Sequence, residues 1–136
     1  MIKKNIATLA LLLSLSVAEA ELEHISVDQL AALMQQDVTV IDIRTPEEWQ
    51  QTGIVAGSHP IMFFDKKGKP HVEEWMQQSA WLIDPEQALI LICRSGNRTT
   101  SVGTFLSNQL GFKKVYSVKG GIKSWLKAGH KTQRIE

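Results

Sequence analysis

The sequence contains very little cysteine and no grouping of residues typical of a metal site. Cys93 is the single cysteine among 136 residues, so no disulfide can form within the chain. A domain without disulfides depends on its hydrophobic core, and this length is enough for one such domain. The histidines are His24, His59, His71 and His130. They are too scattered for metal-ligand spacing, and we expect neither a metal nor another cofactor.

Long hydrophobic runs are also missing. The most apolar stretch, residues 6–17, is interrupted by polar residues and falls well short of the ~20 residues that span a bilayer. It follows two lysines and precedes Ala18-Glu19-Ala20, which places small residues at the positions that signal peptidase reads. This pattern predicts a secretory signal peptide at 1–20 and a periplasmic or secreted domain at 21–136. After signal cleavage we expect no membrane span.

Each half of the chain has few charges of one sign. Residues 21–84 contain 4 basic and 11 acidic side chains, whereas residues 85–136 contain 9 basic and 2 acidic ones. The basic half carries Cys93, and its positive field would attract small anions. No aromatic residues interleave a dense basic patch, so we do not expect nucleic-acid binding.

The chain changes character abruptly at Cys93. Residues 88–92 are all apolar, which suits a strand buried on both faces. Small, polar and basic residues follow at 93–98, and an apolar stripe of helical period begins at Val102. We therefore predict a strand, a tight loop and a helix. Cys93 would lie at the carboxyl end of the strand, where ligands bind in open α/β sheets.

A cysteine in this position is predicted to be a reactive thiolate. The N–H groups of the loop, the N-terminus of the following helix and the nearby Arg94 and Arg98 all favour negative charge. The alternative is a buried structural cysteine, a common role for free cysteines. The polar and basic neighbours favour the reactive thiol.

The loop Cys93-Arg94-Ser95-Gly96-Asn97-Arg98 resembles the active-site loop of the rhodanese family of sulfurtransferases. Three further segments match in the expected order, and together they extend the resemblance over roughly Ser26 to Gly129. They are the Asp-x-Arg strand end and following helix at 40–48, the Gly-rich turn at 53–57 and the closing segment at 120–129.

The Gly-rich turn departs from the family pattern. Family members often have His after the first glycine and Pro before the second, where this chain has Ile54 and Ala56. His59 follows shortly after. We interpret it as a turn residue before Pro60, because nothing in the sequence pairs it with Cys93 as a general base.

The remaining segments predict an α/β domain. Ser26 and Gln29 form a capping box for one helix, and Thr45, Pro46 and Glu48 mark the start of another. Gly111 would end the helix that follows the Cys93 loop. Further strands are expected at 38–43 and 114–118, and a last helix from 122. The alternation indicates a mainly parallel sheet, and the resemblance implies a rhodanese-like three-layer domain with helices on both sides.

The resemblance also implies a reaction and roles for particular residues. Cys93 would take the outer sulfur of a small anionic donor such as thiosulfate as a persulfide, then pass it to a thiophilic acceptor such as cyanide. Residues implied to bind substrate are Arg94, Ser95, Gly96, Asn97 and Arg98. Residues expected to support the loop are Asp42, Arg44 and Thr99, although Asp42 and Arg44 could equally form an ordinary surface pair or local turn.

Two other functions remain open. A persulfide carrier or binding module that passes sulfur to a partner protein would have the same loop. A cysteine phosphatase or arsenate reductase is disfavoured, because those loops place an arginine sixth after the cysteine. Here Thr99 is sixth and Arg98 is fifth.

The segment 63–83 is longer than a minimal connection between strands. Aromatic residues at helical spacing usually pack in a core, so we interpret Phe63, Phe64 and Trp75 as core residues. The alternative is that they line the mouth of the site and select the sulfur acceptor.

Overall fold

The computed structural model describes residues 22–135. The predicted signal peptide lies outside them. The strands are β1 (Leu22–Ile25), β2 (Thr39–Asp42), β3 (His59–Pro60), β4 (Leu89–Ile92) and β5 (Val115–Val118). The helices are α1 (Val27–Met34), α2 (Pro46–Thr52), α3 (Val72–Ser79), α4 (Asn97–Gln109) and α5 (Gly121–Lys127).

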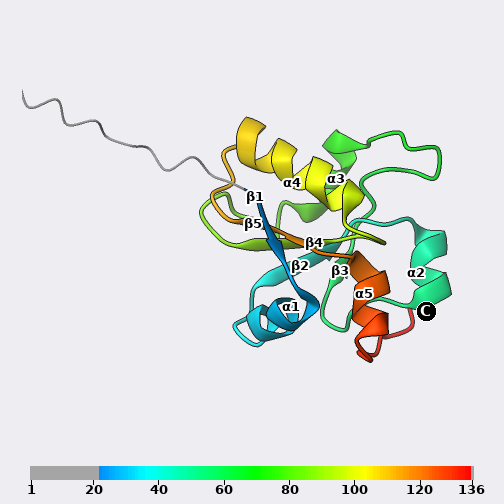
Figure 1. Ribbon diagram of the computed structural model, residues 1–136. Helices are drawn as coiled ribbons and strands as arrows, with labels where there is room; N and C mark the ends of the chain where they lie inside the picture. Colours follow the sequence, from blue (N-terminus) through cyan, green and yellow to red (C-terminus); the bar gives the residue numbers. More distant parts are fainter. Residues whose placement is uncertain (1–21, 136) are drawn as a thin grey trace, which may run out of the picture.

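The five strands form one sheet in the order β1-β5-β4-β2-β3, and every pairing between them is parallel. Figure 1 shows α3 and α4 above the sheet and α1 and α5 below it, with α2 near one end of the strands. The expected three-layer α/β architecture is confirmed. Because all strands run the same way, the segments that follow β2 and β4 emerge at the same edge.

The core consists of two clusters, one on each face of the sheet. Along β4, Leu89 and Leu91 join the cluster that contains residues of α3 and α4, while Ile90 and Ile92 join the cluster that contains residues of α1 and α5. This alternation follows from the pleat of a strand. Cys93 continues it on the α4 side, so its sulfur is directed into the domain.

Local chemistry sets the helix boundaries where the sequence predicts them. Ser26 and Gln29 form the reciprocal capping box that starts α1, with hydrogen bonds of 2.8 and 3.1 Å. Thr45 accepts from the N–H of Glu48 at the start of α2. Gly111 follows α4 with a φ of 70°, a conformation that favours glycine.

Two short strands were not anticipated, and one interpretation was wrong. β1 pairs with β5, and the two-residue β3 pairs with β2, so His59 is a strand residue and not a turn residue. Its ring meets Trp81 edge-on, at 5.6 Å between centroids. β3 has only two residues, and only one of the four residues of β1 is buried, so neither strand has the apolar run that marks β4 in the sequence.

The aromatic residues of the 63–83 segment are divided between core and surface. Phe63 and Trp75 are buried, and their ring centroids lie 5.5 Å apart. Trp81 is 75% exposed. The core interpretation is therefore confirmed for Phe63 and Trp75, whereas Phe64 is only partly buried.

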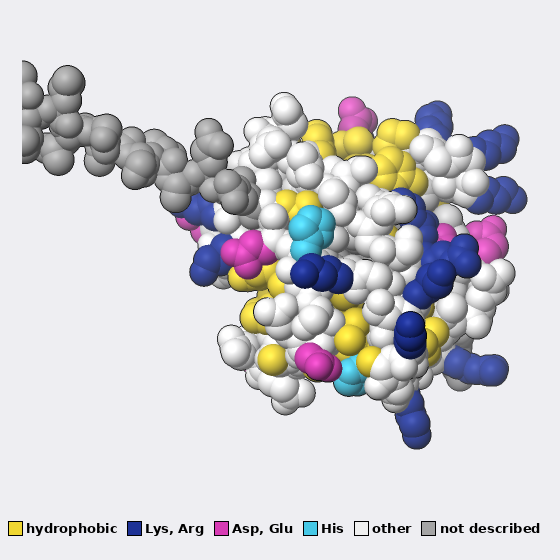
Figure 2. Space-filling model, in the orientation of Figure 1, with side chains coloured by type: hydrophobic (Ala, Val, Ile, Leu, Met, Phe, Trp, Pro, Cys, Tyr) yellow, Lys and Arg dark blue, Asp and Glu magenta, His cyan; other side chains and the backbone are white. Residues whose placement is uncertain are grey.

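Among the described residues, none of the helices has both the length and the apolar character required to cross a bilayer. Figure 2 shows many Lys and Arg side chains on the right-hand side of the molecule. The same side carries α2 and α5 in Figure 1.

Candidate active site

Cys93 directly follows β4 and is 1% exposed. The N–H of Gly96 donates to its Sγ at 3.2 Å, and Thr99 Oγ1 lies 3.6 Å from the same atom. Both contacts come from within the next six residues, because the loop curls back over the sulfur. The sulfur therefore lies in a small polar cradle at the carboxyl edge of the sheet.

Gly96 permits the sharp turn of this cradle. Its φ is 99°, in the left-handed region that L side chains rarely adopt. Its carbonyl oxygen then accepts hydrogen bonds from Thr99 Oγ1 at 3.1 Å and Thr100 Oγ1 at 2.7 Å, which tie the loop to the first turn of α4.

The start of α5 holds the loop from the other side. The N–H of Ile122 donates to the carbonyl of Cys93 at 2.9 Å, and that of Lys123 to the carbonyl of Arg94 at 3.1 Å. Gly121 makes this approach possible, since a Cβ there would overlap the backbone of both residues. This close approach is the physical role of Gly121 in the closing segment at 120–129.

Ser117 is a site residue that the sequence analysis did not identify. It lies on β5, is fully buried, and its Oγ is 2.7 Å from Thr99 Oγ1. Thr99 therefore connects the Cys93 sulfur to a second hydroxyl on the neighbouring strand. A serine in an otherwise apolar strand was the available signal, because a buried hydroxyl requires a partner.

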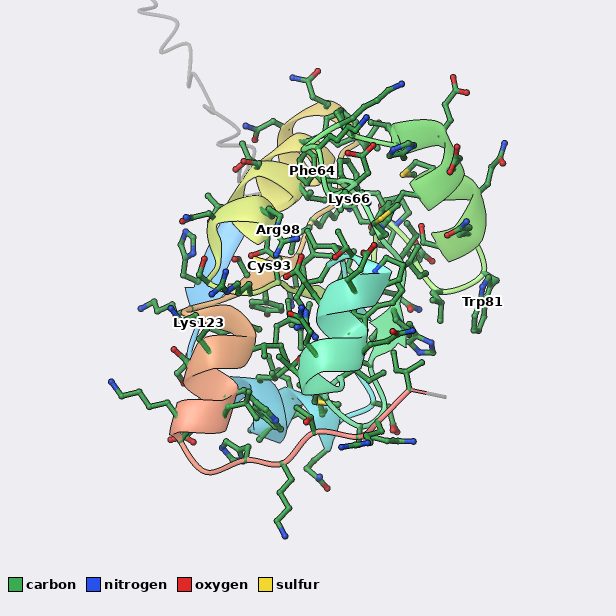
Figure 3. The ribbon with its side chains drawn as sticks, turned by 90° about the vertical axis from the view of Figure 1, so that its right-hand side faces the viewer. Phe64, Lys66, Trp81, Cys93, Arg98 and Lys123 are labelled. Atoms are coloured by element: carbon green, nitrogen blue, oxygen red, sulfur yellow. The ribbon has the colours of Figure 1, made fainter. Side chains whose placement is uncertain are left out.

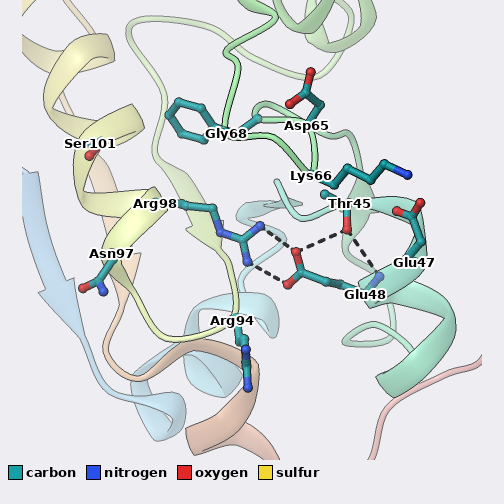
Figure 4. A pocket seen from close by; sticks show the side chains of 11 residues that line it. Thr45, Glu47, Glu48, Asp65, Lys66, Gly68, Arg94, Asn97, Arg98 and Ser101 are labelled. Atoms are coloured by element: carbon teal, nitrogen blue, oxygen red, sulfur yellow. Dashed lines mark hydrogen bonds and ion pairs between the residues drawn. The ribbon is translucent and has the colours of Figure 1, made fainter.

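A cavity of about 810 Å³ opens beside the loop (Figure 4). Its lining residues are Thr45, Glu47, Glu48, Phe64, Asp65, Lys66, Gly68, Arg94, Asn97, Arg98 and Ser101. Figure 3 places Phe64 and Lys66 on the same side of the molecule as Cys93 and Arg98, and Trp81 well apart from them. Of the three aromatic residues considered for the pocket mouth, Phe64 alone lines this cavity.

An ion pair crosses the wall of this cavity. Arg98 Nη1 and Nη2 each donate to one carboxylate oxygen of Glu48 at 2.7 Å (Figure 4). Partial burial by itself raises the pKa of Glu48, but the hydrogen bonds and charge of Arg98 outweigh it and hold that pKa below its usual value. The same hydrogen bonds raise the pKa of Arg98. Both groups are therefore charged at neutral pH.

Asp65 organises the loop at the cavity mouth. Its carboxylate accepts from the N–H groups of Lys67 and Lys69 at 2.9 and 3.0 Å, and lies 2.9 Å from His71 Nε2. The hydrogen bond to His71, followed by the one from Lys69, lowers the pKa of Asp65 to about 2. The loop thus keeps a defined shape over the site.

A second cavity of about 490 Å³ lies on the α5 side of the loop. Its lining residues are Ser95, Gly120, Lys123, Ser124 and Lys127. Both of its charged side chains are basic, in contrast to the mixed lining of the larger cavity.

Asp42 and Arg44 lie at the same sheet edge as Cys93, as expected, but their hydrogen bonds lead elsewhere. Arg44 Nη2 donates to Asp42 at 2.8 Å and to the carbonyl of Gly53 at 2.9 Å, and its Nη1 donates to Thr52 Oγ1 at 2.8 Å. Trp49 Nε1 also donates to Asp42, at 3.1 Å. The pair anchors α2 and the turn after it and has no hydrogen bond to the Cys93 loop. It is not a surface pair, because both side chains are buried. The N–H of Arg44 donates to Asp42 Oδ1 at 3.1 Å, which is the local turn considered as an alternative.

Comparison with known proteins decides the family. Residues 26–128 match the model of the rhodanese-like domain. The chain belongs to the rhodanese-like domain family. The matched residues contain three of the four segments on which the resemblance rests, and all of the closing segment except Gly129.

Relatives of this rhodanese-like domain include named sulfurtransferases. Thiosulfate sulfurtransferase 18 of Arabidopsis thaliana is 28% identical over 117 residues, which cover 84% of this chain and 85% of the relative. Thiosulfate sulfurtransferase GlpE of Pseudoalteromonas translucida is 29% identical over 104 residues, with coverage of 76% and 88%. These similarities support membership of a sulfurtransferase family.

Solved structures give the same fold. The polysulfide-sulfur transferase homodimer of Wolinella succinogenes superposes with a TM-score of 0.66 at 26% identity, covering 87% of this chain and 82% of that one. A rhodanese-related protein from Thermoplasma volcanium gives 0.59 at 27% identity, with coverage of 79% and 94%.

The predicted substrate-binding residues of the rhodanese-like loop differ in how exposed their side chains are. Arg94, Ser95 and Asn97 are exposed, whereas Arg98 is partly buried against Glu48. Gly96 is the residue whose N–H contacts the sulfur. Substrate binding by these residues stays a prediction. Within residues 22–135, no three His, Cys, Asp or Glu side chains are grouped so as to hold a metal ion.

Proposed function

We propose that this chain is a sulfurtransferase that moves a sulfane sulfur from thiosulfate, or a similar small donor, to a thiophilic acceptor such as cyanide through a persulfide on Cys93. The observation that carries the proposal is the cradle around Cys93 Sγ, with the Gly96 N–H at 3.2 Å and the Thr99 hydroxyl at 3.6 Å. A donor N–H aimed at sulfur stabilises negative charge on it.

The reaction has two balanced steps. The Cys93 thiolate attacks the outer sulfur of thiosulfate, the S–S bond of the donor breaks, and sulfite leaves with the bonding electron pair. In the second step cyanide attacks the outer sulfur of the persulfide, and the Cys93 thiolate is released with thiocyanate. This is nucleophilic catalysis through a covalent intermediate, with ping-pong kinetics.

Intact mass spectrometry of residues 21–136 tests the proposal. Thiosulfate should add one sulfur atom to the protein, and cyanide should remove it. Cys93→Ala should show neither change. Wild-type protein that never gains sulfur from thiosulfate or from another sulfane donor would contradict the proposed function.

The persulfide-carrier alternative predicts the same mass change but a different turnover. A carrier would be loaded with one sulfur and would not turn over without a partner protein. An enzyme would form thiocyanate repeatedly from thiosulfate and cyanide alone. A phosphatase would instead hydrolyse an aryl phosphate, which we expect to be negligible. The arginine spacing in the loop and the named sulfurtransferases among the relatives favour sulfur transfer.

We also propose that the protein acts in the periplasm or outside the cell, on the strength of the leader pattern in residues 1–20. Fractionation of cells that express the full chain, followed by N-terminal sequencing, tests this. A soluble product that begins at residue 21 in the periplasmic or external fraction is the expected result.

A further inference from the structure

The pairing of Arg98 with Glu48 changes what the larger cavity can bind. Both terminal nitrogens of Arg98 are engaged by one carboxylate, in the bidentate geometry typical of strong arginine–carboxylate pairs. The two side chains are 28% and 23% exposed, so water screens the pair only partly. An anion approaching Arg98 meets a guanidinium whose charge is already balanced.

The rest of the cavity does not restore a strong positive field. Its lining side chains comprise three carboxylates and three cations: Glu47, Glu48, Asp65, Lys66, Arg94 and Arg98. The positive field expected around Cys93 from the basic half of the chain is therefore not found in this cavity, because only Arg94, Asn97, Arg98 and Ser101 of its lining come from that half. The acidic side chains come from α2 and the loop at 64–70, which the fold brings against the Cys93 loop.

We propose that Glu48 is a specificity-determining residue that lowers the preference of the site for dianionic sulfur donors such as thiosulfate relative to donors with a single negative charge. This rests on the proposed function, because it concerns the donor used by Cys93. A dianion such as thiosulfate must displace or approach the Glu48 carboxylate to reach Arg98, and like charges at close range repel. A monoanionic donor experiences about half of that repulsion and needs fewer cationic partners.

Two donors that differ in charge but share the bond that is broken provide the test. Thiosulfate is a dianion and releases sulfite, whereas methanethiosulfonate is a monoanion and releases methanesulfinate. In both, the Cys93 thiolate attacks the terminal sulfur, and the leaving group departs with the electron pair of the S–S bond. The measured quantity is the ratio of kcat/KM for thiosulfate to kcat/KM for methanethiosulfonate, with cyanide as the acceptor.

Glu48→Gln should raise that ratio by about tenfold, mainly through a lower KM for thiosulfate, because the loss of a competing charge frees Arg98 for a charge-assisted hydrogen bond. Glutamine preserves the size of the side chain. In an Arg98→Gln background the same change should alter the ratio by less than about threefold, since the effect is transmitted through Arg98.

Two other carboxylates serve as comparators. Glu86→Gln removes one charge and breaks a 2.6 Å pair with Lys113, near the opposite end of β4 from Cys93, and should leave the ratio unchanged. Glu47→Gln removes a charge from the same cavity without breaking the Arg98 pair. We expect it to raise the ratio by less than Glu48→Gln does.

The result that overturns the inference is a ratio that Glu48→Gln leaves unchanged or lowers, or that Glu47→Gln raises by as much. If neither donor loads sulfur on wild-type Cys93, the proposed function fails instead. Should Glu48→Gln not fold, protection of wild-type Cys93 from iodoacetamide by sulfate and by methanesulfonate replaces it. Comparable protection supports the inference, and sulfate binding more than about tenfold tighter contradicts it.

Discussion

Two segments leave neighbouring parallel strands at the same edge of the sheet and are built in opposite ways. At the end of β2, Asp42 and Arg44 are almost completely buried, and their polar atoms bond to each other and to α2. After β4, the sulfur of Cys93 is buried, but the side chains of Arg94, Ser95 and Asn97 are exposed. One segment is closed on itself, and the other faces solvent.

The difference indicates which charges act in the fold and which are available to a ligand. A buried ion pair whose donors and acceptors are satisfied has little capacity left for another molecule. Exposed side chains around the buried Cys93 sulfur retain that capacity. The Glu48–Arg98 pair lies between these extremes, partly exposed and at the cavity wall, and it is the pair for which we infer an effect on donor choice.

The largest effect expected in the Cys93 loop follows from removal of the proposed nucleophile. Cys93→Ala should abolish sulfur loading and cyanide turnover completely, because the chain has no other thiol. Its free energy of unfolding should change by no more than about 1–2 kcal/mol, since only one small buried atom is lost. Turnover by thiocyanate assay and urea denaturation measure the two quantities. Residual turnover would mean that the chemistry lies elsewhere.

The corresponding change at the end of β2 should mainly lower the stability of the fold. Asp42→Ala leaves the buried Arg44 guanidinium without its carboxylate, which typically lowers the free energy of unfolding by about 3–5 kcal/mol. Urea denaturation followed by circular dichroism measures this. Glu86→Gln, which breaks an exposed pair with Lys113, should change it by less than about 1 kcal/mol. Equal effects for the two variants would remove the distinction between the buried and exposed pairs.

Arg94→Ala should have a smaller effect, on turnover and not on stability. The Arg94 side chain is exposed in the cavity lining, and loss of a charge-assisted hydrogen bond of ~1.5–3 kcal/mol should reduce thiosulfate-dependent turnover by roughly ten- to a hundredfold. The rate of Cys93 alkylation by the neutral reagent iodoacetamide should fall less. Equal losses in both assays would show that Arg94 tunes the thiol and does not bind the donor.

Ser117 is fully buried, like Asp42 and Arg44, but its hydroxyl is hydrogen-bonded to Thr99 Oγ1, which in turn contacts the Cys93 sulfur. Ser117→Ala should slow alkylation of Cys93 at neutral pH by about fivefold, equivalent to about 1 kcal/mol of lost hydrogen bonding. Ser107→Ala is the matched control, because the Oγ of Ser107 is buried and has no hydrogen-bond partner among residues 22–135. A slower rate in both variants would point to a general packing effect.

The smallest effect is expected at the cavity mouth and depends on pH. The pKa of Asp65 is lowered to about 2 from 3.8, so its contribution to stability is complete above about pH 3.8 and is lost as the pH falls toward 2. Asp65→Asn should therefore reduce the fall in Tm between pH 3.8 and 2. Above about pH 5 it should have little effect on how Tm changes with pH. An unchanged acid profile would contradict the role assigned to the carboxylate.

Local features of the sequence were sufficient for much of this fold. The capping residues Ser26 and Thr45 mark helix starts in the structure as they do in the sequence. The apolar run before Cys93 forms the buried strand β4. These features are local because a cap or a buried strand depends on neighbouring residues. The strands β1 and β3 lack such local signals, because they form only by pairing with strands distant in the sequence.

The candidate site shows the same division. The sequence by itself determined the loop around Cys93, the proposed nucleophile, because Cys93, Gly96 and Thr99 interact within six residues of one another. The tertiary structure decided how that loop is charged and supported. Glu48 meets Arg98 across 50 residues, and Ser117 reaches Thr99 from another strand. The composition gives this half of the chain a net positive charge. Electrostatic interactions and hydrogen bonds, however, depend on distance in space. Those distances are set only when α2 and β5 pack against the Cys93 loop.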